Sequence, residues 1–278
     1  MNMKRRKVLR QNDNRPIGIF DSGVGGLTVV KELAGILPRE DIVYYGDTAR
    51  VPYGTKSSNT IVRFSIENAL FLLKQNVKLI VVACNTSSSV ALPALKRNFK
   101  VPIVGVIHPG ACDAVKACRN SRIGVIGTTA TIKSDAYSRQ IKRISASMKV
   151  YSRGCPLLAP AIEESLDDDR LMTDIIRYYL DPLKKMRIDT LVLGCTHYPI
   201  IKGLIAKVLG RQTNLVDSAK STSAHVKELL TQSMLLSSSR SKGRIKFFVS
   251  DETQNFKRIG ERFLNKRIDH IRKVVYGI

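Results

Sequence analysis

Two matched segments constrain the fold of this chain most strongly. Residues 79–83 and 191–194 are short apolar runs rich in β-branched side chains, which is typical of strands buried on both faces of a sheet. A cysteine follows each run, Cys84 in the first and Cys195 in the second, and hydroxyl or amide side chains come next. Open α/β sheets bind ligands at the carboxyl ends of such strands, beside helix N-termini that stabilise anions and thiolates. The two segments therefore predict two thiols that face one ligand.

The segments around the two cysteines belong to a longer repeat. Residues 123–128 resemble residues 17–22 in their order of strand, turn and hydroxyl side chain. These two openings are separated by nearly the same length of chain as the two cysteines. Such spacing indicates an internal duplication. We therefore predict an α/β protein made of two facing, pseudo-symmetric parallel-sheet units, with the active site in the cleft between them.

The rest of the chain divides around this repeat. Residues 1–15 are polar and basic without periodicity, so they are expected to form a disordered extension. The pattern of the second unit is complete near residue 214, and further strands follow it. We therefore assign residues 16–103 together with 215–278 to the first domain, and residues 104–214 to the second.

Hydrophobic periodicity predicts the other elements. Apolar runs over residues 42–45, 101–107 and 245–249 indicate further buried strands. Residues 60–74 have apolar side chains at helical spacing, and Leu70 is expected on the inner face of that helix. All apolar runs are far shorter than the roughly 20 residues that a membrane-spanning helix needs, so no membrane partner is expected.

Charge and cysteine content bear on partners and on the cellular compartment. The chain carries 46 basic and 23 acidic residues, a net charge of +23. This excess is compatible with nucleic acid as a secondary, charge-driven partner, although the charges are scattered and no basic motif interleaved with aromatic residues is present.

The basic N-terminus lacks the apolar segment of a secretory signal, and the five cysteines lack the spacing of a disulfide framework. A reduced, cytoplasmic protein is therefore expected.

The first strand leads into a glycine-rich turn at residues 21–28. Its glycines let backbone N–H groups approach a ligand closely, and the helix that begins near Leu27 offers its positive end. No Gly-Lys-Ser/Thr follows, as a phosphate loop requires, and Thr28 occupies the place of the third glycine of a dinucleotide fingerprint. A small carboxylate is the better ligand, although a tight turn capped by Asp21 or Ser22 explains the spacing equally well.

A matched pair of thiols supplies the two groups that inversion of a carbon centre requires. A helix N-terminus lowers the pKa of a thiol and desolvation raises it, so one cysteine can act as base while the other acts as acid. His197 can assist Cys195, and Asp21 can assist Cys84 across the turn. A structural histidine and a helix-capping aspartate are equally compatible with this spacing.

Other uses of these residues fit the pattern less well. A zinc site needs about four ligands at short, paired spacings, which neither Cys195 with His197 nor Cys112 with Cys118 provides. A cysteine protease uses one cysteine and leaves the second without a role. Pyridoxal phosphate needs only a Schiff-base lysine, so the absence of a motif does not exclude it. The paired thiols nevertheless give a complete mechanism without a cofactor or a metal.

Four motifs, in order along the chain, strongly resemble those of one family. They are Gly18-Ile19-Phe20-Asp21-Ser22-Gly23-Val24-Gly25-Gly26, Tyr45-Gly46-Asp47-Thr48-Ala49-Arg50-Val51-Pro52-Tyr53-Gly54, Ala83-Cys84-Asn85-Thr86 and Gly194-Cys195-Thr196-His197-Tyr198-Pro199. By these motifs the chain is similar to the glutamate racemases of the cofactor-independent aspartate/glutamate racemase family. The resemblance extends from about Pro16 to at least Asp217. It implies interconversion of L- and D-glutamate by two cysteines, which supplies D-glutamate for peptidoglycan synthesis.

The resemblance also implies roles for individual residues. Cys84 and Cys195 match the two catalytic thiols, of which the first acts on the D-enantiomer and the second on the L-enantiomer. Asp21 and His197 match the residues that assist them, and Glu163 matches an acidic residue that orients the histidine. The positions that hold the carboxylates and the amino group of the substrate match Ser22, Pro52, Tyr53, Gly54, Asn85, Thr86, Thr131 and Thr196.

The resemblance leaves three points open. The segment around residues 157–165 departs from the usual family pattern, which bears on the role of Glu163. A homodimer is expected from the family, but no sequence feature indicates which face is buried. Racemisation of another acidic amino acid, such as aspartate or diaminopimelate, is the main alternative, because the sequence does not set the depth of the pocket.

Overall fold

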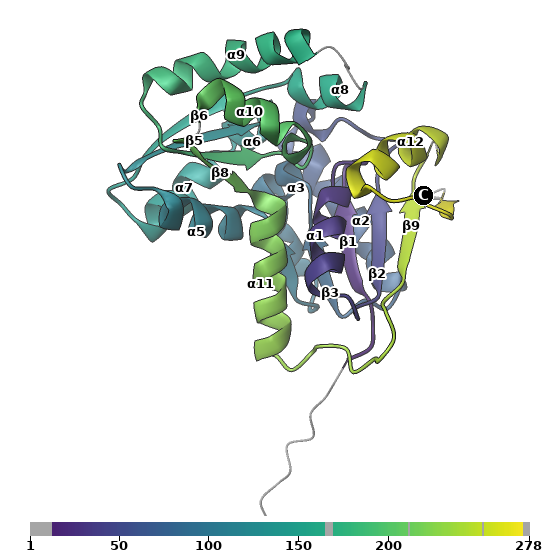
Figure 1. Cartoon of the computed structure of the whole chain (residues 1–278). Coiled ribbons are helices and arrows are strands. Elements are labelled where there is room, and N and C mark those ends of the chain that lie inside the picture. Colours follow the sequence, from purple (N-terminus) through teal and green to yellow (C-terminus); the bar gives the residue numbers. More distant parts are fainter. Residues whose placement is uncertain (1–12, 165–168, 211, 252, 275–278) are drawn as a thin grey trace, which may run out of the picture.

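The computed structural model describes residues 13–164, 169–210, 212–251 and 253–274, and its strands form two sheets (Figure 1). The first is a six-stranded sheet with the strand order β10-β9-β2-β1-β3-β4. Its strands are β1 (Ile17–Asp21), β2 (Ile42–Gly46), β3 (Leu79–Val82), β4 (Ile103–Gly105), β9 (Ile245–Val249) and β10 (Ile271–Lys273). The second is a four-stranded sheet with the order β6-β5-β7-β8. Its strands are β5 (Arg122–Gly127), β6 (Lys149–Gly154), β7 (Thr190–Gly194) and β8 (Asn214–Asp217).

Every strand pairing of these two sheets is parallel, which confirms the predicted fold class of two parallel-sheet α/β units. The two units use equivalent strands in equivalent places. In the first, β1 pairs with β2 and β3; in the second, β5 pairs with β6 and β7. As a result, β3 and β7, the strands that lead into Cys84 and Cys195, flank the opening strand of their unit on the same side.

Helices connect the parallel strands, as parallel pairing requires. The helices between strands of the first sheet are α1 (Leu27–Ile36), α2 (Ser58–Lys74), α3 (Asn85–Val90), α4 (Leu92–Asn98) and α12 (Thr253–Leu264). Those between β4 and β9 are α5 (Ile107–Ala117), α6 (Thr129–Lys133), α7 (Ala136–Ile144), α8 (Leu158–Glu163), α9 (Asp169–Lys185), α10 (Lys202–Leu209) and α11 (Ser218–Gln232). Two 3-10 turns, η1 (Tyr53–Thr55) and η2 (Tyr198–Ile201), complete the connections. Within the described residues, no helix is both long and apolar enough to cross a membrane.

The central strands are buried because helices cover both faces of each sheet. All five residues of β1, β2 and β7 are buried, and so are all four of β3. This burial explains the continuous apolar runs of these strands, since a half-exposed strand would alternate apolar with polar side chains. Because the central strands are buried, their carboxyl ends and the residues that follow them are held in fixed positions.

The last strands return to the first unit. After β8, helix α11 runs back alongside α1, and β9 and β10 then join the edge of the first sheet beside β2 (Figure 1). The domain boundaries predicted at 103/104 and 214/215 fall inside β4 and β8. The division into two domains at those points stays a prediction, and residues 275–278 lie outside the described residues.

The predicted extension over residues 1–15 is too long at its carboxyl end. Residues 1–12 lie outside the described residues, but Asp13 and Asn14 make defined contacts with the first unit. The Asp13 carbonyl accepts a hydrogen bond from Lys78 Nζ at 2.6 Å, and Asn14 Oδ1 accepts one from the Ser238 backbone N–H at 3.0 Å. Asp13 also forms an ion pair with Arg15 at 2.6 Å.

Two local expectations were wrong. Leu70 is 43% exposed, because α2 turns Ala69, Phe71 and Leu72 toward the sheet instead. The strand expected over residues 101–107 is limited to β4, and α5 already begins at Ile107. Pro109 is compatible with this early start because a proline in the first turn of a helix removes no intrahelical hydrogen bond.

Candidate active site

Cys84 follows β3 and caps the N-terminus of α3. Its sulfur accepts a hydrogen bond from the Ser87 backbone N–H at 3.5 Å and lies 3.6 Å from Ser22 Oγ. The residue is only 5% exposed. Burial, together with the nearby negative charge of Asp21, raises the pKa of the Cys84 thiol to about 11, and its hydrogen bonds with Ser87 and Ser22 oppose this rise. At neutral pH, Cys84 is therefore a protonated thiol.

Cys195 occupies the equivalent place after β7 and has a different proton partner. Its sulfur lies 3.6 Å from Nδ1 of His197, and Nε2 of the same ring lies 2.6 Å from Glu163 Oε1. Burial opposes a charge on this imidazole, but hydrogen bonds to Cys195 and Glu163 outweigh it and raise the pKa of His197 well above its usual value. The edge-on ring of Phe263, with its centroid 5.6 Å away, packs against the histidine from α12. Sulfur, imidazole and carboxylate thus form a continuous path for a proton.

Asp21 lies at the end of β1, between the two cysteine environments. Its side chain is fully buried, and the backbone N–H of Gly23 donates to Oδ2 at 3.2 Å. Among the described residues, no hydrogen-bond donor reaches its other oxygen, Oδ1. Burial raises the pKa of Asp21, against the opposing effects of the charge on His197 and of nearby backbone N–H groups. This carboxylate therefore interacts electrostatically with both Cys84 and His197.

The turn after β1 approaches the second unit very closely, and Gly25 makes this approach possible. A Cβ atom at this position would lie 2.5 Å from Cε1 of His197 and would also collide with Thr196 Oγ1. Behind the turn, Thr28 Oγ1 donates to the Thr196 carbonyl at 3.1 Å. The glycine-rich turn therefore packs directly against the segment that carries Cys195 and His197.

Three threonine hydroxyls join the two units beside Cys84. Thr86 Oγ1 of the first unit lies 2.9 Å from Thr128 Oγ1 and 3.3 Å from Thr131 Oγ1, and the last two lie 3.0 Å apart. Thr86 and Thr131 were predicted from the sequence, whereas Thr128 was not. The internal repeat contained the signal, because Thr128 follows β5 at the position where Ser22 follows β1.

A second polar connection runs from the first unit to the second through Asn85. Its Oδ1 accepts a hydrogen bond from Tyr137 Oη at 2.7 Å, and its Nδ2 lies 3.5 Å from Ser218 Oγ. The Ser218 hydroxyl donates to the Leu193 carbonyl of β7 at 3.3 Å. Tyr137 and Ser218 come from helices remote in sequence, so no local pattern indicated that they meet Asn85.

The loop between β2 and α2 contributes to the site less directly. The Tyr53 hydroxyl donates a hydrogen bond to Asp47 and accepts one from Asn68 Nδ2 at 3.1 Å. Its hydroxyl hydrogen is therefore already bonded within the first unit. Pro52 is exposed and follows a cis peptide bond. Gly54 packs so closely on Thr128 that a Cβ atom would lie 2.8 Å from the threonine Cβ.

The predicted site residues thus divide into two groups. Most are buried at the ends of β1, β3 and β7 and in the segments that pack on them, whereas Pro52 and Tyr53 lie in a neighbouring loop. The geometry offers two thiols, each in its own hydrogen-bonded environment, and hydroxyl and amide groups that follow Cys84 in the chain and link the two units. Within the described ranges, no three His, Cys, Asp or Glu side chains gather in a way that could hold a metal ion.

Comparison with known proteins identifies similar chains over nearly the full length. The family described as Asp/Glu/Hydantoin racemase matches residues 26–229. The glutamate racemase of Geobacter metallireducens is 49% identical over 260 residues, which cover 94% of this chain and 96% of that protein.

Solved structures agree with this similarity. A glutamate racemase isoform of Bacillus anthracis superimposes with a TM-score of 0.92 at 39% identity, covering 95% of this chain and 98% of that one. The glutamate racemase of Francisella tularensis, solved in complex with D-glutamate, superimposes with a TM-score of 0.88 at 42% identity, covering 94% and 98%.

Proposed function

The chain belongs to the Asp/Glu/Hydantoin racemase family and is an amino-acid racemase, and we propose that it interconverts L- and D-glutamate by proton transfer between Cys84 and Cys195. The observation that carries this proposal is the placement of the two thiols. They follow equivalent strands, β3 and β7, and each has a separate hydrogen-bond partner. The choice of glutamate is supported by the relatives, which are glutamate racemases at 44–49% identity in the most similar cases.

The proposed reaction moves one proton at each face of the α-carbon. A thiolate on one face removes the α-proton, and a carbanion-like transition state develops. The thiol on the opposite face delivers its own proton to the same carbon, which inverts the configuration. The enzyme ends with the thiol and the thiolate exchanged, so each cysteine is base in one direction and acid in the other.

The neighbours of each thiol have different tasks in this scheme. His197 takes up or returns the proton of Cys195, because its Nδ1 faces that sulfur and Glu163 holds the other side of the ring. Cys84 carries the proton in the resting enzyme, since its pKa is raised to about 11 by burial and by Asp21. This arrangement assigns the first proton removal from L-glutamate to Cys195 and the first delivery to Cys84.

The polar groups between the thiols hold the substrate in the same scheme. The hydroxyls of Ser22, Thr86 and Thr131 and the amide of Asn85 can bind the two carboxylates. In doing so they exchange their present hydrogen bonds, which join Ser22 to Cys84, Thr86 to Thr131 and Asn85 to Tyr137. Both thiols are at most 6% exposed, so glutamate enters only when the segments that pack over them separate. Closure around the substrate then excludes water and strengthens each charged interaction.

Racemisation in heavy water tests the proposal. L-Glutamate should convert to an equal mixture of enantiomers, followed by circular dichroism, and deuterium should appear at the α-carbon of the product before it appears in the remaining substrate. L-Aspartate and diaminopimelate serve as alternative substrates. Faster turnover of either alternative would contradict the choice of glutamate. Early deuterium in the substrate, or a pyridoxal absorption band in the purified protein, would contradict the two-thiol mechanism.

The cellular role and the assembly are parts of the same proposal. D-Glutamate made in the cytoplasm would serve peptidoglycan synthesis, and a reducing compartment suits a chain in which Cys84 and Cys195 are both free thiols. A homodimer follows from the family resemblance. Light scattering gives the mass of the particle, and a monomer at working concentration would contradict that part.

A further inference from the structure

A large open cavity lies on the first unit, at the sheet edge formed by β9 and β10. Its volume is about 1070 Å³, and its walls come from α1, the α1–β2 turn, the segment before β9, and the α12–β10 connection. The floor is apolar, with Leu37, Phe247 and Ile268 all buried. Phe247 and Phe248, which both line the cavity, are thus covered and present little surface on which a base could stack, whereas His270 in the same lining is exposed.

The rim of this cavity is strongly basic. Seven exposed cations line it, one of them Arg244, which lies 3.9 Å from Asp41. In the part of the chain that the structure describes, no carboxylate is within ion-pair distance of the other six, which are Lys31, Lys242, Lys246, Lys266, Arg267 and Arg272.

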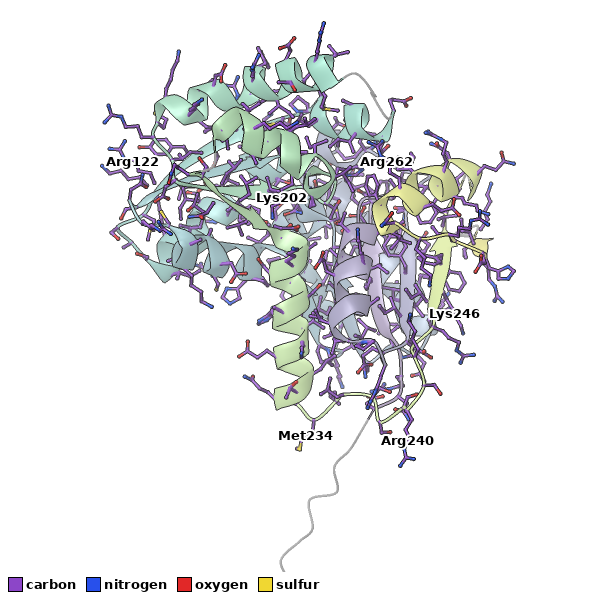
Figure 2. The ribbon with its side chains drawn as sticks, in the orientation of Figure 1. Arg122, Lys202, Met234, Arg240, Lys246 and Arg262 are labelled. Atoms are coloured by element: carbon purple, nitrogen blue, oxygen red, sulfur yellow. The ribbon has the colours of Figure 1, made fainter. Side chains whose placement is uncertain are left out.

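Carboxylates do little to offset this charge. Glu40 also lines the cavity, but it is ion-paired with the buried Lys78 at 2.6 Å, and Asp269 is the other acidic side chain there. Arg240, on the loop that leads to β9, extends the basic surface beyond the cavity, and Figure 2 shows it with Lys246 at the outer edge of the first unit. The surface therefore attracts anions over a wider area than one small ligand can contact.

The form of this surface favours a chain of phosphates over two other occupants. A small anion is normally held by a few fixed, buried polar groups, whereas the seven cations here are exposed side chains from three stretches of chain, α1, residues 242–246 and residues 266–272. A second copy of this chain cannot present the same face to it, because two sets of cations would repel each other.

We propose that this basic cavity binds nucleic acid through its phosphate backbone, without reading the bases. Phosphates spaced along a strand can contact cations from all three stretches at once. Binding through phosphates is strongly weakened by salt, since it releases condensed counterions. This role is independent of racemisation, because in the described part of the chain no hydrogen bond or ion pair joins the seven rim cations to Cys84, Cys195 or their partners.

Two triple variants of equal charge test the proposal. The first, Lys246→Glu/Arg267→Glu/Arg272→Glu, reverses the charge of three rim cations. The second, Lys142→Glu/Arg143→Glu/Lys149→Glu, reverses three exposed cations on α7 and β6 of the other unit. Both change the net charge by the same amount. The binding of a fluorescent single-stranded oligonucleotide is followed by anisotropy at several salt concentrations, and racemase activity serves as the check on folding.

The rim variant should weaken binding at least about tenfold more than the control at low salt. The slope of log K against log salt should fall by about 2, because three phosphate contacts are lost at about 0.7 each. Equal losses in the two variants would overturn the proposal, because binding would then follow net charge alone. Competition by pyrophosphate at micromolar concentration would instead assign the cavity to a small phosphorylated ligand. Equal competition by polyglutamate or by anionic vesicles would overturn the choice of nucleic acid.

Discussion

His197 and Glu163 are joined by a contact of 2.6 Å between Nε2 and Oε1, which leaves Nδ1 of the ring directed at Cys195. On this side of the site, the imidazole of His197 can therefore exchange a proton with the thiol of Cys195. Among the described residues, no imidazole contacts Cys84, which lies instead beside Ser22 and near Asp21. The two halves of the site are therefore chemically asymmetric, although the strands that build them are equivalent.

The substitution Glu163→Gln should impair only the Cys195 side. Loss of the carboxylate lowers the pKa of His197, so less of the imidazole is protonated near Cys195. Elimination from a glutamate analogue with a leaving group on the β-carbon needs one base only and separates the two faces. We expect the rate with the L-analogue to fall about 10²-fold, within the usual range for a general acid–base group, while the D-analogue is unaffected.

The neighbouring Glu164 provides the matched control for this prediction. It is exposed, and its carboxylate faces no cation within ion-pair distance in the described structure, so Glu164→Gln should retain full activity. The shift of the His197 pKa can be followed by NMR of the ring protons. An equal loss with both analogues would show that Glu163 supports the whole site rather than the histidine.

The raised pKa of Cys84 predicts a steep pH dependence when this thiol acts alone. In a Cys195→Ser variant, elimination from the D-analogue depends on the Cys84 thiolate. Burial and the Asp21 charge raise the pKa of Cys84 to about 11, so less thiolate is present at a given pH. We expect kcat/KM to rise about tenfold per pH unit from about pH 7 to about pH 10.

A further substitution, Asp21→Asn in the same variant, removes the negative charge beside the thiol. The pKa of Cys84 then falls, and the profile should level off at lower pH, whatever happens to the maximum rate. A profile that is already flat near neutral pH in the parent variant would be inconsistent with a raised pKa of Cys84.

Gly25→Ala should strongly impair catalysis because of a steric conflict. The added Cβ would lie 2.5 Å from Cε1 of His197, so the turn after β1 or the histidine must move. We expect kcat/KM to fall by about 10²-fold, the cost of a shift of roughly 1 Å in a catalytic group.

Gly35→Ala is the control for Gly25→Ala. It lies in α1, and apart from its chain neighbours and the backbone of that helix, no atom of the described residues lies within 4 Å of an added Cβ. This substitution should leave activity intact and stabilise the fold by about 0.4–1 kcal/mol, which thermal unfolding can measure. Normal activity of Gly25→Ala would show that the turn and the histidine segment do not have to stay in contact.

Thr131→Val should weaken both substrate binding and stability. The substitution keeps the shape but leaves the hydroxyls of Thr86 and Thr128 without one partner, which costs about 1–3 kcal/mol for a buried group. We expect KM for glutamate to rise and kcat to change less. Thr131→Ser retains the hydroxyl and should restore KM; failure to restore it would mean that the methyl group matters instead.

Lys78→Met should destabilise the fold far from the site. Lys78 is fully buried and binds Glu40 together with the carbonyls of Asp13 and Leu235, so its removal leaves a buried carboxylate unpaired. A loss of about 3–5 kcal/mol in the free energy of unfolding by urea is expected. Lys31→Met, on the surface, should change it by less than about 0.5 kcal/mol. Equal destabilisation by Lys78→Met and Lys31→Met would mean that the buried ion pair of Lys78 with Glu40 contributes no more to stability than a surface charge does.

The sequence was informative where local pattern and structure coincide. The continuous apolar runs identified β1, β3 and β7, and the repeat placed Cys84 and Cys195 at equivalent strand ends. The edge strand β10 was not predicted, because its Ile-Arg-Lys sequence is too short and polar to resemble a buried strand.

Contacts between remote segments could not be predicted in the same way. Tyr137 meets Asn85 only because α7 and α3 pack across the two units, and the helical spacing of α7 specifies no partner. The contact of His197 with Glu163 likewise joins segments whose spacing in sequence carries no signal; only the family resemblance indicated it. Long-range polar geometry depends on the packed fold rather than on any single element.

The central claim is that each face of the α-carbon is served by its own cysteine, and single-base elimination tests it most directly. The variants Cys84→Ser and Cys195→Ser are each incubated with both enantiomers of the β-substituted glutamate analogue, and ammonia release is measured. Both variants should have lost racemisation. Cys84→Ser should still process the L-analogue and Cys195→Ser the D-analogue, each with little activity on the other enantiomer. Equal processing of both enantiomers by both variants would contradict the two-thiol account.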